Sequence, residues 1–446
     1  MHLLSYRGPS AAGGISSALN ALWNHPGSNY MGWWHVADGA LVQSMGCSRQ
    51  SRLQALAQDT IQAHYRFCNE FIWPLVHGFP DKISFCARSR EMYSSFQEQV
   101  LQALVTQTEQ DLFIHDYQFA LMPSRTSNAT FFWHIVWPSE VNEQWQPYLR
   151  KLATGIAGAS RIGFHTDQYA QNFLNSLDEP MRQEVEQKIF VSPLPVDYEL
   201  WQARANEPTT PLAEPFSNLT TPYILSVDRA DYTKGIVERL RSIDILFETH
   251  PELRGKITFV QLCQRTRTEV RAFADYWVEC HKAHEQLNRK WGSEGWSPSH
   301  WVESVFGPEQ LAVIYKNAHA LLISSLADGL NLTAKEFVAS QLERPGILLL
   351  SRGAGVSQQL GEHANSFDAT DVRAAAEAIA DALKQSNEGR LDRMTRMQSV
   401  LAGESLVKWS EQFAPSRNLS PVFRGELRSK RVLELKPLTT GVPRFH

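Results

Sequence analysis

The sequence lacks a hydrophobic run long enough to cross a membrane. Its longest apolar stretches, such as residues 320–323 and 347–350, fall far short of the roughly 18 apolar residues that a bilayer requires. The first residues also lack the basic region and long apolar segment that mark a secretory signal. We therefore expect a cytoplasmic protein that has no membrane partner.

The sequence has few cysteines and a small net charge. Lys and Arg number 43 against 47 Asp and Glu, and the net charge of -4 provides no global field that would recruit nucleic acid. This balance does not exclude a basic pocket at one place in the fold. The cysteines are odd in number and scattered, which fits reduced thiols better than disulfides or a metal knuckle. They are Cys47, Cys68, Cys86, Cys263 and Cys280.

The remaining composition is that of a globular protein. Hydrophobic residues make up 43% and charged residues 20% of the 446 positions, so a disordered chain is excluded. The length predicts two or three domains of roughly 150 residues each. The 13 tryptophans and 22 phenylalanines fit either thick cores or a protein that stacks sugars on aromatic rings.

Short apolar runs alternate with stretches of helical period, the pattern of strand-helix-strand units on a parallel sheet, so the fold class is α/β. Residues 206–222 contain four prolines and little periodicity, which predicts a linker. We expect domains at 1–207 and 208–400, with a final helix and a basic tail at 401–446. Strands are expected at residues 111–115, 130–135, 161–165, 223–227, 257–261, 320–324 and 346–351.

Residues 227–235 follow an expected strand and precede a helical run. Arg229 and Lys234 would lie near a strand's carboxyl end and a helix N-terminus, where open α/β sheets bind phosphate. Two cations suit a diphosphate leaving group. The alternative is an ordinary pairing of these cations with Asp228 and Asp231 inside the loop.

Residues 325–336 repeat the order of strand, glycine turn and helix. Gly329 would allow the backbone to approach a ligand, and the amides of Leu330 and Asn331 could bind phosphate. Glu336, one helical turn further, could accept from a ribose diol. The alternative is an acidic residue that stabilises the helix N-terminus.

The first half of the chain carries weaker signals. Arg7 precedes Gly13 and Gly14, and a glycine pair that opens a helix can cradle an anion or simply form a turn. His115 and His134 each follow an apolar run. Such histidines are usually buried in a core, but their paired spacing favours a site.

Taken together and in order, these segments resemble the trehalose-6-phosphate synthase family of nucleotide-sugar glycosyltransferases. The family motifs are His-Asp-Tyr, Phe-Phe-x-His-x-x-x-Pro-Ser, Gly-Phe-His-Thr, Val-Asp-Arg-x-Asp-Tyr-x-Lys-Gly and Asp-Gly-Met-Asn-Leu-x-x-x-Glu. Only the last departs, with Leu330 in place of Met. The matches lie at residues 115–117, 131–139, 163–166, 227–235 and 328–336.

This resemblance implies two Rossmann-like domains of the GT-B type that face each other across a cleft, with a last helix crossing back to the first domain. It implies retaining transfer of glucose from a nucleoside diphosphate glucose, with UDP-glucose the expected donor, to glucose 6-phosphate, giving trehalose 6-phosphate. No cofactor and no metal are expected. Catalysis would act by positioning and charge stabilisation, with the leaving phosphate oxygen taking the acceptor proton.

The resemblance also implies roles for individual residues. Arg229 and Lys234 would hold the diphosphate, and Glu336 would bind ribose. His134 would lie beside the transferred glucose, and Asp116 would contact the acceptor sugar. The remaining expected donor residues are Gly13, Gly14, Asp328, Gly329, Leu330, Asn331 and Leu332.

The expected acceptor site rests on fewer matches. By resemblance Arg7, Trp73 and Arg267 would hold the acceptor phosphate, and Trp33 would lie near the acceptor. The family tyrosine position is His64 here, with Tyr65 one place later. Other departures from the family pattern are Gln118, Pro195 and Ala327.

Two other functions stay open. A glucosylglycerol-phosphate synthase or related enzyme would use glycerol 3-phosphate or another phosphorylated acceptor, but Arg267 favours a hexose phosphate. A catalytically silent module could sense sugar phosphates, although Arg229 and Lys234 are intact. The expected partners are small-molecule substrates and a phosphatase acting on the product, and a homo-oligomer is an open alternative.

Overall fold

The computed structural model of the chain describes residues 1–9, 14–24, 30, 32–45, 49–105, 111–126 and 128–413. By their contacts, residues 1–413 form one compact unit. Gly13 and the basic tail therefore lie outside the described residues. None of the helices in the described ranges has the length and apolar character needed to traverse a bilayer.

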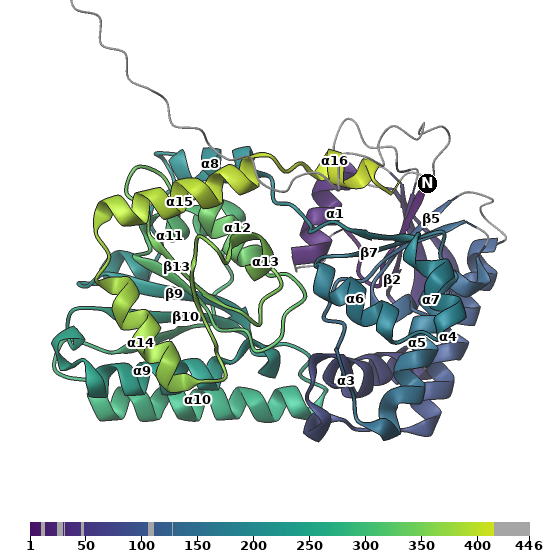
Figure 1. Ribbon diagram of the computed structural model, residues 1–446, viewed down its shortest axis with the longest axis horizontal. Helices are drawn as coiled ribbons and strands as arrows, with labels where there is room; N and C mark the ends of the chain where they lie inside the picture. Colours follow the sequence, from purple (N-terminus) through teal and green to yellow (C-terminus); the bar gives the residue numbers. More distant parts are fainter. Residues whose placement is uncertain are drawn as a thin grey trace, which may run out of the picture. The chain divides into compact units, whose positions relative to one another are not determined.

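Two sheets organise the described chain (Figure 1). Sheet A has the strand order β4-β3-β2-β1-β5-β6-β7-β8, and sheet B has the order β11-β10-β9-β12-β13-β14. The strands of sheet A are β1 His2–Leu4, β2 Gly32–Ala37, β3 Ala40–Met45, β4 Arg49–Ala55, β5 Leu112–His115, β6 Ala129–Phe132, β7 Arg161–Phe164 and β8 Ile189–Val191. Those of sheet B are β9 Tyr223–Arg229, β10 Thr258–Gln264, β11 Ser299–Val302, β12 Ala320–Ile323, β13 Ile347–Ser351 and β14 Asn365–Phe367.

Helices connect the strands, as crossovers between parallel strands require. The first nine are α1 Gly14–Asn24, α2 Gln58–Arg66, α3 Trp73–His77, α4 Ala87–Val105, α5 Gln146–Ala157, α6 Asp167–Asn175, α7 Glu179–Glu186, α8 Tyr198–Asn206 and α9 Ile236–Thr249. The others are α10 Arg271–Trp291, α11 Pro308–Asn317, α12 Leu332–Ala339, α13 Ser357–Leu360, α14 Val372–Leu383, α15 Asn387–Ala402 and α16 Leu406–Glu411.

The central strands are buried on both faces. In β12, Leu321 and Ile323 pack into one core and Leu322 into another, because successive strand side chains point to opposite faces. The α/β class and the two sheets, parallel in sheet B and mostly so in sheet A, are confirmed. Each of the seven expected strands is present, whereas the division into domains at residues 207 and 400 stays a prediction.

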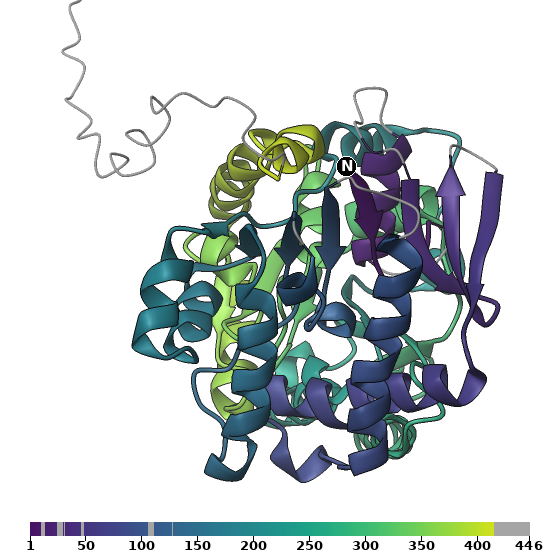
Figure 2. The same cartoon turned by 90° about the vertical axis from the view of Figure 1, so that its right-hand side faces the viewer.

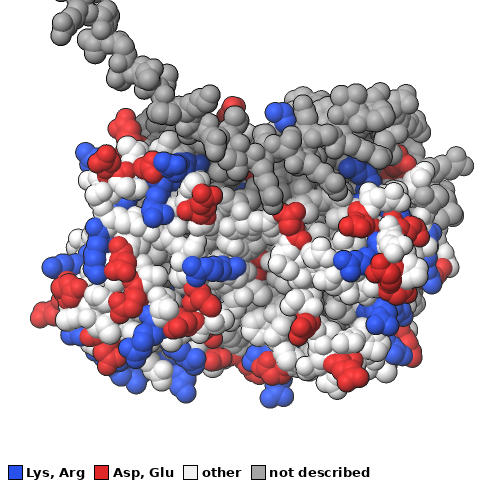
Figure 3. Space-filling model, in the orientation of Figure 1, with Lys and Arg blue, Asp and Glu red and all other residues white. Residues whose placement is uncertain are grey.

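The antiparallel strands β2, β3 and β4 at the edge of sheet A were not expected from the sequence (Figure 2). Polar residues such as Gln43 and Ser44 interrupt the apolar character of β3. Strands β8 and β14 span three residues each, too few to give a periodic signal, and β11 begins with the polar Ser299 and His300. On the described surface shown in Figure 3, acidic and basic side chains are interspersed.

Helix α16 packs against sheet A. Trp409 is 3% exposed, and its ring lies 5.3 Å from that of Phe132. The indole Nε1 donates to the carbonyl of Ser192 at 3.0 Å, and Thr130 Oγ1 donates to the carbonyl of Phe413 at 3.3 Å. The end of the described chain is thus held by both apolar contacts and hydrogen bonds.

We expect Trp409→Ala to lower the free energy of unfolding by about 3 kcal/mol, because it removes a buried aromatic ring and leaves the Ser192 carbonyl without its donor. Urea unfolding would measure the change. Leu391→Ala on α15 is the matched control, since Leu391 is 49% exposed and its loss should change stability by less than about 0.5 kcal/mol. Equal effects of the two substitutions would contradict the anchoring role of Trp409.

Candidate active site

Polar residues of the motifs lie where parallel strands end. Strand β9 ends at Arg229, β5 ends immediately before Asp116, and β6 ends two residues before His134. Ligands of open parallel sheets bind outside these carboxyl ends. The strand ends therefore mark the region in which a ligand site is expected.

Asp231 and Arg267 form a buried ion pair. The Nη1 atom of Arg267 donates to Asp231 Oδ2 at 2.8 Å, and the amide of Thr233 donates to Oδ1 at 3.1 Å. Burial alone would raise the pKa of Asp231, but the Arg267 cation and the Thr233 amide hold it below its ordinary value. The guanidinium of Arg267 also lies 4.0 Å from the ring centroid of Trp73.

Lys234 and Asp328 form a second ion pair. Their Nζ and Oδ2 atoms are 2.5 Å apart, and Asn331 Nδ2 donates to the same oxygen at 3.0 Å. Burial would raise the pKa of Asp328, but Lys234 and Asn331 stabilise the carboxylate and lower it. The pair joins the loop after β9 to the loop after β12.

Arg229 is the cation left over by this pairing. Among the described residues its guanidinium has no hydrogen bond or ion pair, because Asp228 pairs with Arg239 at 2.8 Å and Asp231 pairs with Arg267. Burial, then the positive charges of Arg267 and Arg7, lower the pKa of Arg229. The alternative of loop pairing is therefore wrong for Arg229, and the geometry leaves a half-buried positive charge for an anionic ligand.

Asp116 has an unusual backbone conformation and a raised side-chain pKa. Its φ of 72° lies in the left-handed region, which is strained for a residue other than glycine. Its carboxylate accepts from the amide of His134 at 3.2 Å. Burial raises the pKa of Asp116 to about 7, although this hydrogen bond and the charge of Arg267 favour the ionised form.

Three buried histidines form a hydrogen-bonded row beside Asp116. His134 Nε2 lies 2.9 Å from His115 Nδ1, and His134 Nδ1 lies 3.2 Å from His165 Nε2. The amide of Leu194 donates to His165 Nδ1 at 3.3 Å. Burial lowers the pKa of His134 to about 3, so its ring is neutral near pH 7. Because both ring nitrogens of His134 are engaged, a sugar hydroxyl would have to compete with a histidine for this ring.

The glycine at position 329 permits a close backbone approach. A Cβ atom there would lie 2.1 Å from the carbonyl oxygen of His134 and 2.7 Å from the Cα of Ile135. The loop after β12 therefore packs directly on the loop after β6. The side chain of Leu330 is buried, so only its backbone could face a ligand.

The helix that follows begins at Leu332, with Asn331 as its N-cap. The Asn331 side chain accepts from the amide of Ala334 at 3.0 Å. Glu336 on this helix accepts from the hydroxyl of Tyr315 at 3.2 Å, and burial raises the pKa of Glu336 to about 7. Among the described residues no second hydrogen bond to the Glu336 carboxylate is formed, so its other oxygen can serve a ligand.

Two expected acceptor contacts are corrected by burial. Trp33 has no exposed surface and donates from Nε1 to Ser5 Oγ at 2.7 Å within the core. His64 is equally buried, bonds the carbonyl of Gln118 at 3.0 Å, and has its pKa lowered to about 4 by burial. Neither side chain can touch a ligand in this structure.

Tyr65 fits the acceptor side better than His64. It is half-buried, and the charges of Arg267 and Arg7 both act on its hydroxyl, which places it near two expected phosphate contacts. Arg7 itself is exposed after β1, while Gly14 is the first residue of α1. Gly13 lies outside the described residues.

Two tyrosines were missed by the sequence analysis. Tyr315 carries no motif and holds Glu336 from α11. Tyr169 donates to the carbonyl of Asp328 at 3.0 Å, which ties α6 to the loop after β12. The cap residue Thr166, which accepts from the amide of Tyr169 at 3.1 Å, was the available signal, since it closes the Gly-Phe-His-Thr motif.

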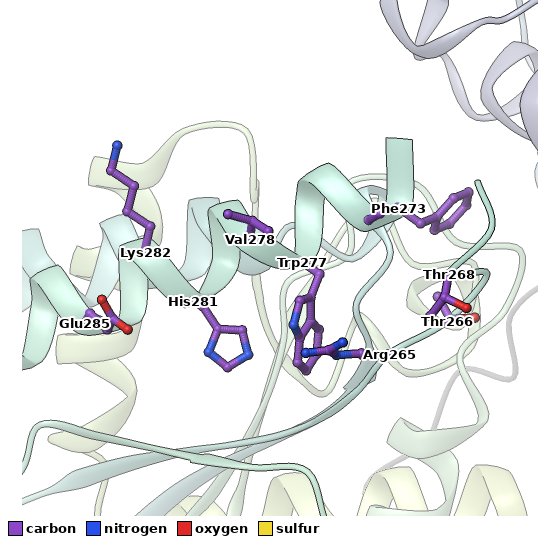
Figure 4. A pocket seen from close by; sticks show the side chains of 10 residues that line it. Arg265, Thr266, Thr268, Phe273, Trp277, Val278, His281, Lys282 and Glu285 are labelled. Atoms are coloured by element: carbon purple, nitrogen blue, oxygen red, sulfur yellow. The ribbon is translucent and has the colours of Figure 1, made fainter. Parts of the chain in front are cut away.

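A separate cavity of about 490 Å³ lies along α10 (Figure 4). Its lining includes Arg265, stacked 4.7 Å from the ring centroid of Trp277, but not Arg229, Lys234 or Arg267. It is therefore not part of the candidate active site. In the part of the chain that the structure describes, no cluster of three or more His, Cys, Asp or Glu side chains is arranged for a metal ion.

The chain is similar to known proteins over most of its length. The model of glycosyltransferase family 20 matches residues 4–418. A bifunctional trehalose-6-phosphate synthase/phosphatase of Thermoproteus tenax is 30% identical over 80% of this chain, which spans only 52% of that relative's length. A trehalose-6-phosphate synthase of an Enterobacter species is 28% identical, covering 91% of this chain and 90% of that protein.

The fold has a close counterpart among solved structures. An alpha,alpha-trehalose-phosphate synthase (UDP-forming) of Burkholderia xenovorans, solved in complex with glucose-6-phosphate, superposes with a TM-score of 0.82. The sequences are 25% identical, and the superposition covers 92% of this chain and 98% of that one. The two-sheet architecture is thus shared over nearly the whole described chain.

The raised pKa of Asp116 predicts a pH-dependent stability. Because the folded carboxyl titrates at about 7 rather than 3.8, the native state binds more protons across that window, and stability falls as pH rises through it. Asp116→Asn keeps an acceptor for the His134 amide and removes the titration. We expect this variant to be more stable than the wild type by on the order of 3 kcal/mol at about pH 8, and by little at about pH 4.

Urea unfolding of both proteins at several pH values would measure this difference. Asp81→Asn is the control, since its side chain is 70% exposed and its substitution should leave the pH dependence unchanged. Parallel pH profiles of the wild type and Asp116→Asn would show that Asp116 does not titrate as described.

Proposed function

The chain belongs to glycosyltransferase family 20, and from this premise we propose that it transfers glucose from UDP-glucose to glucose 6-phosphate, giving trehalose 6-phosphate with retention. The guanidinium of Arg229, half-buried and without a partner among the described residues, carries this proposal, since a fixed positive charge at a strand's carboxyl end is suited to a diphosphate. The names of the relatives supply the donor and the acceptor.

The donor would lie against the loops after β9 and β12. Arg229 would bind the diphosphate directly, and Lys234 would share its charge between Asp328 and the phosphates. The amides of residues 329–332 would complete the phosphate and sugar contacts, and Glu336 would accept from the ribose. Gly14, the first residue of α1, would approach from the first half of the chain.

The acceptor would lie on the sheet A side. Arg267 forms hydrogen bonds with Asp231 and Tyr117, and its remaining N–H groups can bind the sugar phosphate, with Arg7, Tyr65 and Trp73 nearby. Asp116, whose pKa is near neutrality, would accept from an acceptor hydroxyl.

Catalysis in this proposal is electrostatic. As the glycosidic bond breaks, negative charge grows on the departing phosphate, where Arg229 and Lys234 stabilise it before the acceptor oxygen attacks. The departing phosphate oxygen takes the proton of that oxygen, so no enzyme nucleophile is required. Independence of metal and cofactor stays a prediction, as do the cytoplasmic location and the oligomeric state.

The product is a phosphate ester that a phosphatase would have to cleave to release a neutral sugar. The Thermoproteus tenax relative is named for both activities, and this chain spans about half of it. We therefore propose that a phosphatase consumes the product of this reaction.

The function is tested by measuring nucleotide release from UDP-, ADP- and GDP-glucose with glucose 6-phosphate or glycerol 3-phosphate as acceptor. We expect release with UDP-glucose and glucose 6-phosphate, and trehalose 6-phosphate as the product. Preference for glycerol 3-phosphate would make the chain a glucosylglycerol-phosphate synthase. Absence of release with every pair would favour a silent sensor and overturn the proposal.

Arg229→Ala should lower kcat by roughly 100-fold or more, because it removes a preorganised charge at the leaving group. Arg241→Ala is the control, since Arg241 is an exposed arginine on the following helix α9. Steady-state kinetics with the donor varied would measure both variants, and a kcat of Arg229→Ala close to that of the control would contradict the diphosphate role.

Arg267→Ala should raise the KM for glucose 6-phosphate far more than the KM for the donor. This variant also leaves Asp231 buried without its cation. Arg267→Lys is therefore measured beside it, because lysine keeps the positive charge but lacks the planar guanidinium that binds a phosphate through two N–H groups. Arg271→Ala is the control, with a side chain 94% exposed. Equal changes in both KM values would argue against a contact with the acceptor.

A further inference from the structure

Lys335 is a fully buried cation on α12, next to Glu336. Its Nζ atom donates to the carbonyl of Leu194 at 3.0 Å and to the two carboxylate oxygens of Glu404 at 3.2 and 3.0 Å. Its side chain is 0% exposed, and that of Glu404 is 16% exposed. An ammonium in such a place is expensive to bury unless every donor is used.

The two partners of Lys335 lie on the segments that connect the sheets. Leu194 follows β8, the last strand of sheet A, and precedes α8 on the way to sheet B. Glu404 lies between α15 and α16, where the chain returns to pack on sheet A. One ammonium on α12 therefore holds both connections between the sheets.

Leu194 also links Lys335 to the histidine row. While its carbonyl accepts from Lys335, its amide donates to His165 Nδ1 at 3.3 Å, and His165 in turn bonds His134. The backbone amide of His134 holds the carboxylate of Asp116. A continuous series of hydrogen bonds thus runs from the proposed donor helix α12 to the proposed acceptor carboxylate.

We propose that Lys335 is a positioning residue for glucosyl transfer, which aligns α12 with the histidine row by holding the carbonyl of Leu194. The proposal rests on the proposed function. Stability alone does not account for this cation, since a buried ion pair is often no more stabilising than an apolar pair of similar volume. What an apolar pair cannot do is bind the Leu194 carbonyl.

Three variants separate alignment from stability. Lys335→Met removes the contact with Leu194 and leaves the Glu404 carboxylate without its cation, with only the hydrogen bond from Gln359, so stability and kcat should both fall. Glu404→Leu removes the ion pair but leaves the Lys335 amine bonded to Leu194, so stability should fall while kcat stays within about threefold of the wild type. The double variant should regain part of the stability that Lys335→Met loses, because two apolar side chains replace the ion pair, although the Leu194 carbonyl and the Gln359 amide lose a partner. Its kcat should stay reduced roughly 10- to 100-fold by misalignment.

The measurements are thermal unfolding, steady-state kinetics at saturating substrates, and hydrogen exchange of the peptide that contains Leu194. Faster exchange in Lys335→Met and in the double variant, but not in Glu404→Leu, is the result expected from the proposal. Recovery of kcat together with stability in the double variant would show that Lys335 serves stability alone, and it would overturn the proposal.

The same outcomes distinguish this proposal from the proposed function. If the wild type transfers no glucose, the alignment role fails together with the proposed function, whereas exchange still reports whether Lys335 holds Leu194. If the wild type is active and exchange at Leu194 is equal in all variants, only the role of Lys335 is refuted.

Discussion

Pairing of buried charge is the constraint on which the candidate site depends. Asp228, Asp231 and Asp328 lie at or just beyond the ends of strands β9 and β12, and each is neutralised by one cation, from Arg239, Arg267 and Lys234. A buried carboxylate without such a partner would be strongly destabilising. Because these three acids are each paired with another cation, no acid among the described residues neutralises Arg229. A positive site therefore arises in a chain whose net charge is -4.

Close backbone packing complements this pairing. Gly329 has no side chain, so the loop after β12 reaches the backbone of His134 and Ile135 at the end of β6. The proposed donor and acceptor residues can therefore act on one pair of substrates without long side chains between them. Lys335 on α12 adds a second contact between the two sides of the site, because it binds the carbonyl of Leu194, whose amide binds His165. Position, more than an unusual nucleophile, is what this site supplies.

Sequence patterns predicted the fold well where strands are buried on both faces and poorly elsewhere. The seven expected strands are largely apolar runs, whereas β3, which lies next to the edge strand β4, carries Gln43 and Ser44 and was missed. For the site, Arg229 and Lys234 were expected at a strand end because a motif surrounds them. Trp33 and His64 were expected at the acceptor because of their positions alone, and burial, which position does not report, excludes both.

The sequence by itself determined the alternation of strands and helices, the order of the motifs and the identity of the cations available to a phosphate. These depend on residues close together in the chain. Only the tertiary structure decided which acid pairs with which cation, since Lys234 and Asp328 are 94 residues apart and Lys335 and Glu404 are 69 apart. Pairing is a property of distance in space and of burial, so only the fold decides that Arg229, among the described residues, is the cation that these pairs leave without a partner.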